Sequence, residues 1–275
     1  MTLNIIKVGG GIVEKEESLN LLLNDFSLLQ GPKLLVHGGG RLATTLATQL
    51  GIETHMVEGR RVTDADMLRV VTMVYGGLVN KRIVAQLQAR GINALGLTGA
   101  DCNTIRSHRR PPVETVKKQD NSPSPGNPLP TAIDYGFVGD IDCCDGDMLA
   151  TLIRQGITPV VAPLTHDGHG QLLNTNADTI ASAVAKSLAP HFDVTLTFCF
   201  EKKGVLRDAS DEDSVIPHIT AADFALLRQQ GIVADGMVPK LENALSACQA
   251  GVKRVVITRA DLLGQPDSGT VVTYQ

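Results

Sequence analysis

Apolar residues in the first hundred positions form two kinds of pattern. Short segments rich in Val, Ile and Leu are typical of buried strands, and they cover 3–8, 33–37 and 92–97. Apolar residues spaced three and four apart indicate helices, and they cover 18–29, 41–50 and 64–90. Ser18 and Thr63 are the predicted N-caps of two of these helices, and Glu53–Val62 alternates as a hairpin does.

The same alternation continues after residue 144. Helices are predicted over 145–155, 177–188, 220–230 and 241–250, and strands over 157–162, 194–199, 254–258 and 270–274. Strands that alternate with helices imply a mainly parallel sheet covered on both faces, so the fold class is α/β, a three-layer α/β/α sandwich. Residues 109–130 break the pattern, because six of the 13 prolines lie between Pro111 and Pro130. We expect a loop or flexible flap there, and we favour a tolerated surface insertion over the alternative of a functional lid.

Composition narrows the function. The 275 residues carry a net charge of −4, with three Tyr, six Phe and no Trp. Few aromatics and slight acidity argue against binding to nucleic acid. No apolar run is long enough to cross a membrane. Five cysteines without a C-x-x-C pair indicate reduced, mostly buried thiols in a cytoplasmic protein. His166 and His169 lack a third ligand at matching spacing, so no metal site is expected.

Two glycine triplets each follow a predicted strand, at 9–11 and 38–40. Backbone N–H groups at such turns can bind phosphate oxygens, and Lys7 lies two residues before the first triplet. The P-loop sequence is absent. An alternative is a dinucleotide site, because Gly38-x-Gly40-x-x-Ala43 fits that fingerprint with Glu58 beyond it. The first glycine triplet would then have no role, and Arg60 and Arg61, just after Glu58, are better suited to binding a carboxylate than to a dinucleotide site.

Polar residues also open the predicted helix at 177–188. Asn174, Asn176 and Asp178 precede Ala- and Val-rich sequence, so they indicate either helix caps or a buried polar site. Lys240 precedes another helix and, taken alone, has the features of a surface lysine. His37 ends a strand beside glycines, and we interpret it as structural.

Taken together, these segments resemble the amino acid kinase family. The matching motifs run in order along the chain: Ile5-Ile6-Lys7-Val8-Gly9-Gly10, Val36-His37-Gly38-Gly39-Gly40, Gly59-Arg60-Arg61-Val62-Thr63-Asp64, Leu173-Asn174-Thr175-Asn176-Ala177-Asp178 and Asp235-Gly236-Met237-Val238-Pro239-Lys240. Asp134–Asp140 is also similar to a family segment. The resemblance implies one domain whose N-lobe, 1–175, binds an acylated amino acid and whose C-lobe, 176–275, binds ATP.

The resemblance also implies a role for each matched residue. Lys7 and Lys240 would stabilise the transferring phosphoryl group, and Asp178 would orient both lysines. The residues implied to bind substrate are Gly39, Gly40, Arg61, Asn174 and Asn176; those implied to bind nucleotide are Gly9, Gly10, Glu201, Gly204 and Leu206. The implied reaction transfers the γ-phosphoryl of ATP, with Mg²⁺ on the nucleotide, to the side-chain carboxylate of N-acetyl-L-glutamate or a close N-acylglutamate, in arginine biosynthesis.

Some positions depart from the family pattern. In Phe200–Leu206, where the family usually has T/S-D-V-x-G-V-L, only Gly-Val-Leu is kept. Arg60 replaces a leucine, and the Pro-rich segment is longer than in compact members. Open alternatives are therefore N-succinylglutamate, another amino-acid carboxylate, or a non-catalytic effector-binding homologue. Lys7 lies near the start of the sequence, which leaves no room for the N-terminal helix of hexameric members, so the resemblance implies a homodimer.

Overall fold

A computed structural model of the chain describes residues 1–57, 59–115, 131–234, 237–265 and 268–274. Its largest feature is an eight-stranded sheet of order β14-β16-β15-β13-β1-β2-β10-β5. The strands, in that order, are His218–Ile219, Thr270–Val272, Arg254–Arg259, Asp193–Phe200, Thr2–Val8, Lys33–His37, Thr158–Val161 and Ala94–Leu97. Neighbouring strands are parallel except for the antiparallel pair β15 and β16.

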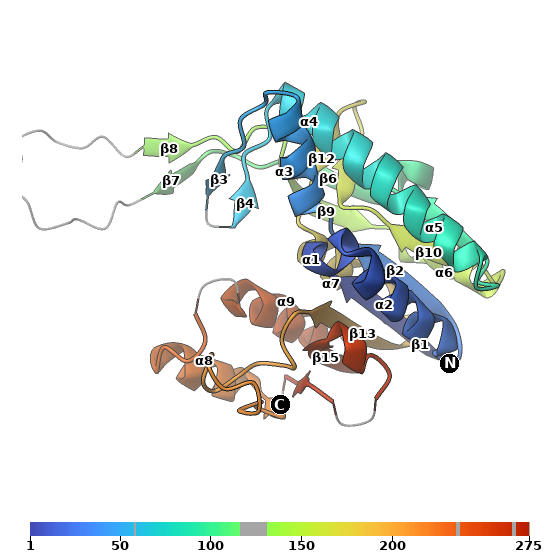
Figure 1. Cartoon of the computed structure of the whole chain (residues 1–275), viewed down its shortest axis with the longest axis vertical. Helices are drawn as coiled ribbons and strands as arrows, with labels where there is room; N and C mark the ends of the chain where they lie inside the picture. Colours follow the sequence, from blue (N-terminus) through green and yellow to red (C-terminus); the bar gives the residue numbers. More distant parts are fainter. Residues whose placement is uncertain (58, 116–130, 235–236, 266–267, 275) are drawn as a thin grey trace, which may run out of the picture.

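Helices cover both faces of this sheet (Figure 1). One face packs against α1 (Gly10–Glu14), α2 (Glu16–Leu28), α3 (Gly40–Gln49), α4 (Ala65–Val71), η1 (Thr72–Val79) and α5 (Asn80–Gln88). The other packs against α6 (Gly146–Arg154), α7 (Ala177–Leu188), α8 (Ala221–Gln229) and α9 (Met237–Gln249). The predicted three-layer α/β/α sandwich with a mainly parallel sheet is confirmed.

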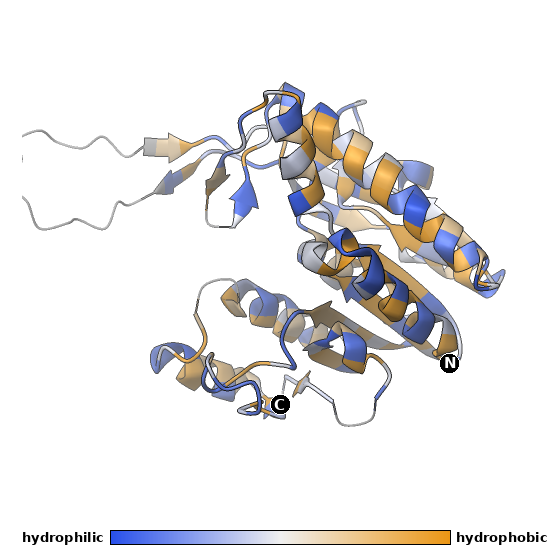
Figure 2. Cartoon of the chain, viewed as in Figure 1, coloured by the Kyte–Doolittle hydropathy of each residue, from blue (hydrophilic) through white to orange (hydrophobic). Residues whose placement is uncertain are grey.

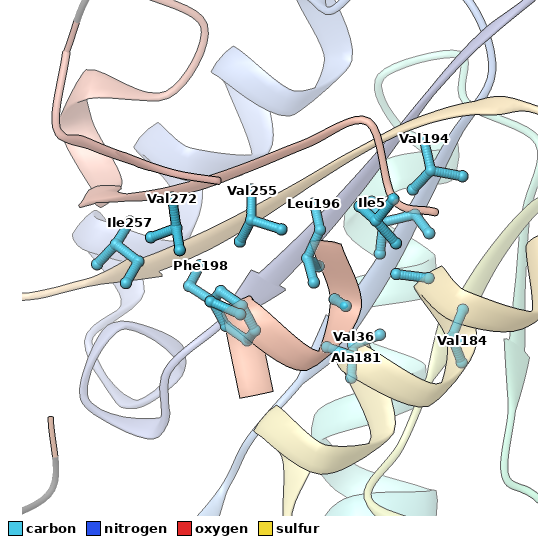
Figure 3. Packing of buried hydrophobic residues seen from close by; sticks show 14 of the residues in the cluster. Ile5, Val36, Ala181, Val184, Val194, Leu196, Phe198, Val255, Ile257 and Val272 are labelled. Carbon is cyan, nitrogen blue, oxygen red and sulfur yellow. The ribbon is translucent and has the colours of Figure 1, made fainter. Parts of the chain in front are cut away.

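Strand β1 shows why the layers separate cleanly. Its side chains alternate between the two faces, so Leu3 and Ile5 join the hydrophobic cluster under α7 while Ile6 and Val8 join the opposite one. Figure 3 shows the first cluster, in which Ile5 lies near residues of the neighbouring strands and of α7. Figure 2 shows that apolar residues dominate the strands of the central sheet, whereas the covering helices carry both apolar and polar residues.

The fold also contains a four-stranded sheet that the sequence did not predict. It has the order β12-β11-β6-β9, with strands Leu172–Asn174, Leu164–His166, Ile105–Arg109 and Gly139–Cys144. Strands β11 and β12 have only three residues each, and β6 and β9 are partly exposed, so none of the four has a long apolar run like those of the central sheet.

The predicted loop at 109–130 is therefore partly wrong. It begins inside β6, and it contains β7 (Val113–Thr115), which pairs with β8 (Thr131–Ile133). Pro111 and Pro112 lie between β6 and β7 and interrupt no strand, so strands form on both sides of them. Residues 116–130 lie outside the described part of the chain.

Two predicted caps are also wrong. Asp64, not Thr63, caps the long helix, since its carboxylate accepts the Met67 N–H at 2.8 Å. Thr63 is buried and donates to the Arg61 carbonyl. Ser18 lies inside α2, which begins at Glu16 after the unpredicted α1. The long helix itself is confirmed as the unbroken succession α4, η1 and α5, in which η1 is π-helical.

The hairpin expected at 53–62 is confirmed by β3 (Met56–Val57) and β4 (Arg60–Arg61), which pair antiparallel. Short 3-10 turns, η2 (Asp101–Asn103) and η3 (Ala260–Leu262), complete the elements.

The expectation of mostly buried thiols is wrong, because Cys199 is buried whereas Cys102 and Cys143 are exposed. Across the described residues, no helix has the length and apolarity needed to traverse a bilayer.

Candidate functional site: a lysine pair beside two glycine turns

Three charged side chains meet where β1 ends and α7 begins. Lys7 Nζ lies 2.7 Å from Asp178 Oδ1, and Lys240 Nζ lies 3.4 Å from Asp178 Oδ2. The three side chains are 9%, 12% and 24% exposed for Lys7, Asp178 and Lys240. The sequence motifs placed these residues 171 and 62 positions apart, and the fold brings them together.

The central position of β1 explains why Lys7 is buried. Its partners in register are Val36 on β2 and Phe198 on β13, both members of the cluster under α7. Lys7 thus shares the face of Leu3 and Ile5, which is the face that α7 covers. Because β1 lies between β13 and β2, Lys7 is not on an edge strand and does not face water.

The electrostatics of the centre favour an ionised Asp178. Burial by itself raises the pKa of this carboxyl, but the charges of Lys7 and then Lys240, with their hydrogen bonds, hold the pKa below its usual value. The cluster carries two positive charges and one negative charge, so it keeps a net positive charge that an anionic group can use.

The two glycine turns touch each other backbone to backbone. A Cβ on Gly38 would lie 3.1 Å from the Gly10 nitrogen, and one on Gly10 would lie 3.4 Å from the Gly40 nitrogen. Side chains at these positions would push the turns apart. Gly9 and Gly39 occupy the N-cap positions of α1 and α3, so the amino ends of both helices open at the same place.

A cleft of about 170 Å³ adjoins this centre. It reaches Ala177, the residue before Asp178. Its lining includes the predicted substrate residues Gly39, Gly40, Arg61, Asn174 and Asn176. It also includes five residues for which the sequence predicted no role, namely Met56, Tyr75, Val138, Pro163 and Thr175, although Val138 and Thr175 lie within matched segments. Tyr75 had no motif to mark it, since it lies within an apolar helical stretch.

Arg61 is buried and held in place from one side. Its Nη2 donates to the Gly40 carbonyl and to Thr44 Oγ1, both at 2.8 Å. Tyr75 lies beside it, and burial raises the pKa of this phenol while the Arg61 charge partly offsets the rise. The tyrosine ring also explains Gly39, because a Cβ there would approach Tyr75 Cδ1 to 2.9 Å.

Both asparagines of the N-x-N-A-D motif have structural partners. Asn174 Nδ2 donates to Thr63 Oγ1 at 3.0 Å. Asn176 Oδ1 accepts the backbone N–H groups of Asp178 at 2.8 Å and Thr179 at 3.1 Å, so Asn176 is the N-cap of α7. The capping interpretation of Asn176 holds, and it also fixes the backbone that carries Asp178.

His37 is structural, as expected. It is fully buried, with Nδ1 2.8 Å from the Gly38 carbonyl and Nε2 3.1 Å from Asn80 Nδ2. Burial lowers the pKa of His37 to about 4, so the neutral ring donates to Gly38 and accepts from Asn80. Because Asn80 also donates to the Val160 carbonyl at 2.9 Å, the second glycine turn is tied to two further elements.

The predicted nucleotide residues divide into two groups. Gly9 and Gly10 lie at the glycine turns, and exposed Glu201 lies against Gly11. Gly204 instead packs on β16, where a Cβ would lie 2.8 Å from Thr270 Oγ1, and Leu206 forms a bridge with Val215. Asp235, Gly236 and Glu58 lie outside the described residues. The described part of the chain holds no group of three or more His, Cys, Asp and Glu side chains placed for a metal ion.

Comparison with known proteins adds a family. A profile of the amino acid kinase family matches residues 2–259. Acetylglutamate kinase of Phocaeicola vulgatus is 62% identical over 270 residues, which cover 98% of each chain. Acetylglutamate kinase of Bacteroides fragilis is 58% identical over 98% of this chain and 95% of the relative. Acetylglutamate kinase of Methanopyrus kandleri is 38% identical over 98% of this chain and all of the relative.

Solved structures share the fold. The smu.665 protein of Streptococcus mutans superposes with a TM-score of 0.75 at 26% identity, covering 99% of each chain. Carbamate kinase of Giardia lamblia bound to AMP-PNP has a TM-score of 0.66 at 14% identity, covering 99% of this chain and 98% of that one. Because the family profile and the relatives extend along nearly the whole sequence, the chain belongs to the amino acid kinase family.

Proposed function

We propose that the chain is an acetylglutamate kinase, which transfers the γ-phosphoryl group of ATP to the side-chain carboxylate of N-acetyl-L-glutamate and forms an acyl phosphate in arginine biosynthesis. The relatives of that name support the substrate and the donor. The observation that carries the proposal is the placement of Asp178 between Lys7 and Lys240, beside two glycine turns and a small cleft.

The chemistry of the acceptor fits a centre of this kind. The side chain of a glutamate in water has a pKa of about 4.3, so the attacking carboxylate is already ionised at neutral pH and needs no general base. The obstacle is repulsion between the carboxylate and the phosphates. Lys7, Lys240 and the backbone N–H groups of the glycine turns would supply fixed positive charge and donors where negative charge accumulates.

Asp178 would act as a positioning residue in this scheme. It holds the two lysines on either side of one carboxylate, so both ammonium groups are oriented before substrate arrives. Its low pKa keeps it ionised throughout the physiological range. Asn176 would support it indirectly by fixing the first turn of α7.

The cleft provides the complementary parts for an acylated amino acid. Arg61 would bind a substrate carboxylate, and Asn174 with the Gly39 and Gly40 backbone would bind the polar amide region. Apolar Met56, Val138 and Pro163 also line the cleft and would face the acyl group. The assignment of residues 1–175 to substrate and 176–275 to nucleotide remains a prediction.

Mg²⁺ is part of the proposal. Both oxygens of Asp178 lie within ion-pair distance of lysines. The backbone of the two glycine turns suits phosphate oxygens. The residues present therefore fit a metal that is carried by the nucleotide phosphates. When bound there, Mg²⁺ neutralises phosphate charge.

A coupled ADP-release assay over a panel of acceptors tests the proposal. N-acetyl-L-glutamate and N-succinyl-L-glutamate are the candidates, with free glutamate and aspartate as controls. We expect turnover that depends on an N-acylated glutamate. If no N-acyl compound supports ADP release, the proposed function is wrong, and a non-catalytic effector-binding role becomes the better account.

One observation favours N-succinylglutamate as a second candidate. Arg60, in place of a leucine, lines the same cleft as Arg61. A second cation there suits an acyl group that carries its own carboxylate. Comparison of kcat/KM for the two acyl compounds, in the wild type and in Arg60→Leu, decides between them. Loss of succinyl preference in Arg60→Leu supports the second candidate.

A further inference from the structure

An exposed ion pair lies over the first glycine turn. Arg41, in the first turn of α3, has Nη2 3.5 Å from Glu201 Oε1 and Nη1 3.8 Å from Glu14 Oε2. Glu201 follows β13 and Glu14 ends α1, so the three charges come from three different elements. Neither distance is that of a hydrogen bond, and Arg41 is 61% exposed.

The position of this pair is unusual for a surface salt bridge. A Cβ on Gly11 would overlap Glu201 Oε1 and would lie 3.3 Å from Arg41 Nη1. Gly11 follows Gly10, whose own Cβ would touch the Gly40 nitrogen. The guanidinium of Arg41 and the carboxylate of Glu201 therefore lie where α1 and α3 both begin.

We propose that Arg41 binds a phosphate oxygen of the nucleotide, and that the Glu201 carboxylate holds its guanidinium over the glycine turns until the nucleotide displaces it. The inference rests on the proposed function, because it places the ATP phosphates at these turns. Glu201 thus pairs with Arg41 in the absence of nucleotide, and Arg41 is a further nucleotide-binding residue.

Charge and geometry support the exchange. Arg41 is flanked by two carboxylates, so these three groups together carry one net negative charge, and the two carboxylates oppose phosphate binding beside Gly11. Movement of Glu201 away from Gly11 removes one of these charges and frees the guanidinium. A guanidinium matches a phosphate through two parallel N–H donors, which is a stronger arrangement than the loose pairing with Glu201.

Stability alone does not account for this arrangement. Ion pairs between exposed side chains contribute little to folding, and Glu201 is as exposed as Arg41. Glu201 also lies in the loop that departs from the family pattern, where Phe200 and Lys202 replace the usual residues. Arg41 and Glu201 together give this loop a charged link to the glycine turn.

Calorimetric titration with AMP-PNP and Mg²⁺ tests the exchange without relying on turnover. Arg41→Met should raise the Kd roughly tenfold, as loss of one charge-assisted phosphate contact does, and Arg41→Lys should recover part of the affinity. Glu201→Gln should lower the Kd about two- to threefold, because the competing carboxylate is gone. These opposite changes in Kd are the result expected if Glu201 and phosphate compete for Arg41.

Lys253→Met serves as the matched control. Lys253 forms an exposed pair with Asp193 at 3.7 Å, at the other end of β13, and its loss should leave the Kd unchanged. Equal Kd values for the wild type and Arg41→Met, or weaker binding by Glu201→Gln, would overturn the inference while the proposed function stands. Absence of AMP-PNP binding to the wild type would overturn both.

Discussion

At the scale of single residues, the buried charges were the most predictable part of the site. A lysine inside an apolar strand costs free energy unless it has a partner, so Lys7 stood out in the sequence. Tyr75 and Arg41 did not, because an aromatic in an apolar helix and an arginine at a helix start are ordinary. Their importance depends on the contact of two glycine turns, which no local pattern encodes.

The lysines give a direct prediction. Lys7→Ala and Lys240→Ala should each lower kcat by about 100-fold or more, as loss of one preorganised donor does. The KM for N-acetyl-L-glutamate should change much less, because the lysines act on the phosphoryl group. Steady-state kinetics measures both. Lys186→Ala is the control, since Lys186 lies on α7 and donates to Ser246 Oγ at 2.7 Å, away from Asp178. Near-normal kcat in either test variant would remove that lysine from the mechanism.

His37 predicts a dependence of stability on pH. Its pKa is about 4 in the folded chain and about 6.5 when unfolded, so the unfolded state takes up the proton first as pH falls. The stabilisation is complete above pH 6.5 and is lost below it, by about 2 kcal/mol between pH 7.5 and 5.0. Urea unfolding at the two pH values measures the loss. His37→Gln should lose less over the same range, and an identical loss would contradict the assignment.

At the scale of elements, the strands and helices of the central sandwich followed from hydrophobic periodicity. The exact ends of the helices did not, because neighbouring polar residues can each serve as the N-cap. Asp64 caps the helix where Thr63 was expected to, and Thr63 is instead buried against Asn174. The sheet of β12, β11, β6 and β9 was not predicted, because its strands are short or partly exposed and lack a long apolar run. Helix α7 is the element on which the site depends most, since it carries both Asn176 and Asp178.

The cap of α7 allows two roles of Asn176 to be separated. Asn176→Ala should lower the free energy of unfolding by about 1 kcal/mol, because two backbone N–H groups lose their acceptor. Asn176→Ser keeps a capping oxygen and should retain most of the stability. If Asn176 also binds substrate, the serine variant will be stable yet have a higher KM for N-acetyl-L-glutamate. Equal stability of the alanine variant and the wild type would contradict the capping role.

At the scale of the whole molecule, one sheet joins the two halves of the chain. Strands β13 and β1 pair along their full lengths, so the glycine turn after β1 and the loop after β13 are held side by side. This connection explains how Lys7, Asp178 and Lys240 come from distant segments yet meet within 3.4 Å. The sequence motifs identified these residues, but the packing of α7 against β1 and α9 is what places them together.

The molecular surface bears on the predicted homodimer. Met73 and Leu78 on η1 are 52% and 58% exposed. Exposed apolar side chains on one helix favour burial against a second copy. Light scattering should give twice the chain mass of 29.2 kDa, and the double variant Met73→Glu, Leu78→Glu should give the monomer mass. A monomeric wild type would contradict the homodimer.

The central claim is phosphoryl transfer to a side-chain carboxylate at the Lys7–Asp178–Lys240 centre. Hydroxylamine trapping tests it most directly, because an acyl phosphate reacts to give a stable hydroxamate. With Mg²⁺, ATP and N-acetyl-L-glutamate, we predict the side-chain hydroxamate in amounts equal to the ADP released. The succinyl analogue would give the corresponding hydroxamate if it is the better substrate. ADP release without any hydroxamate from either acceptor would contradict the account.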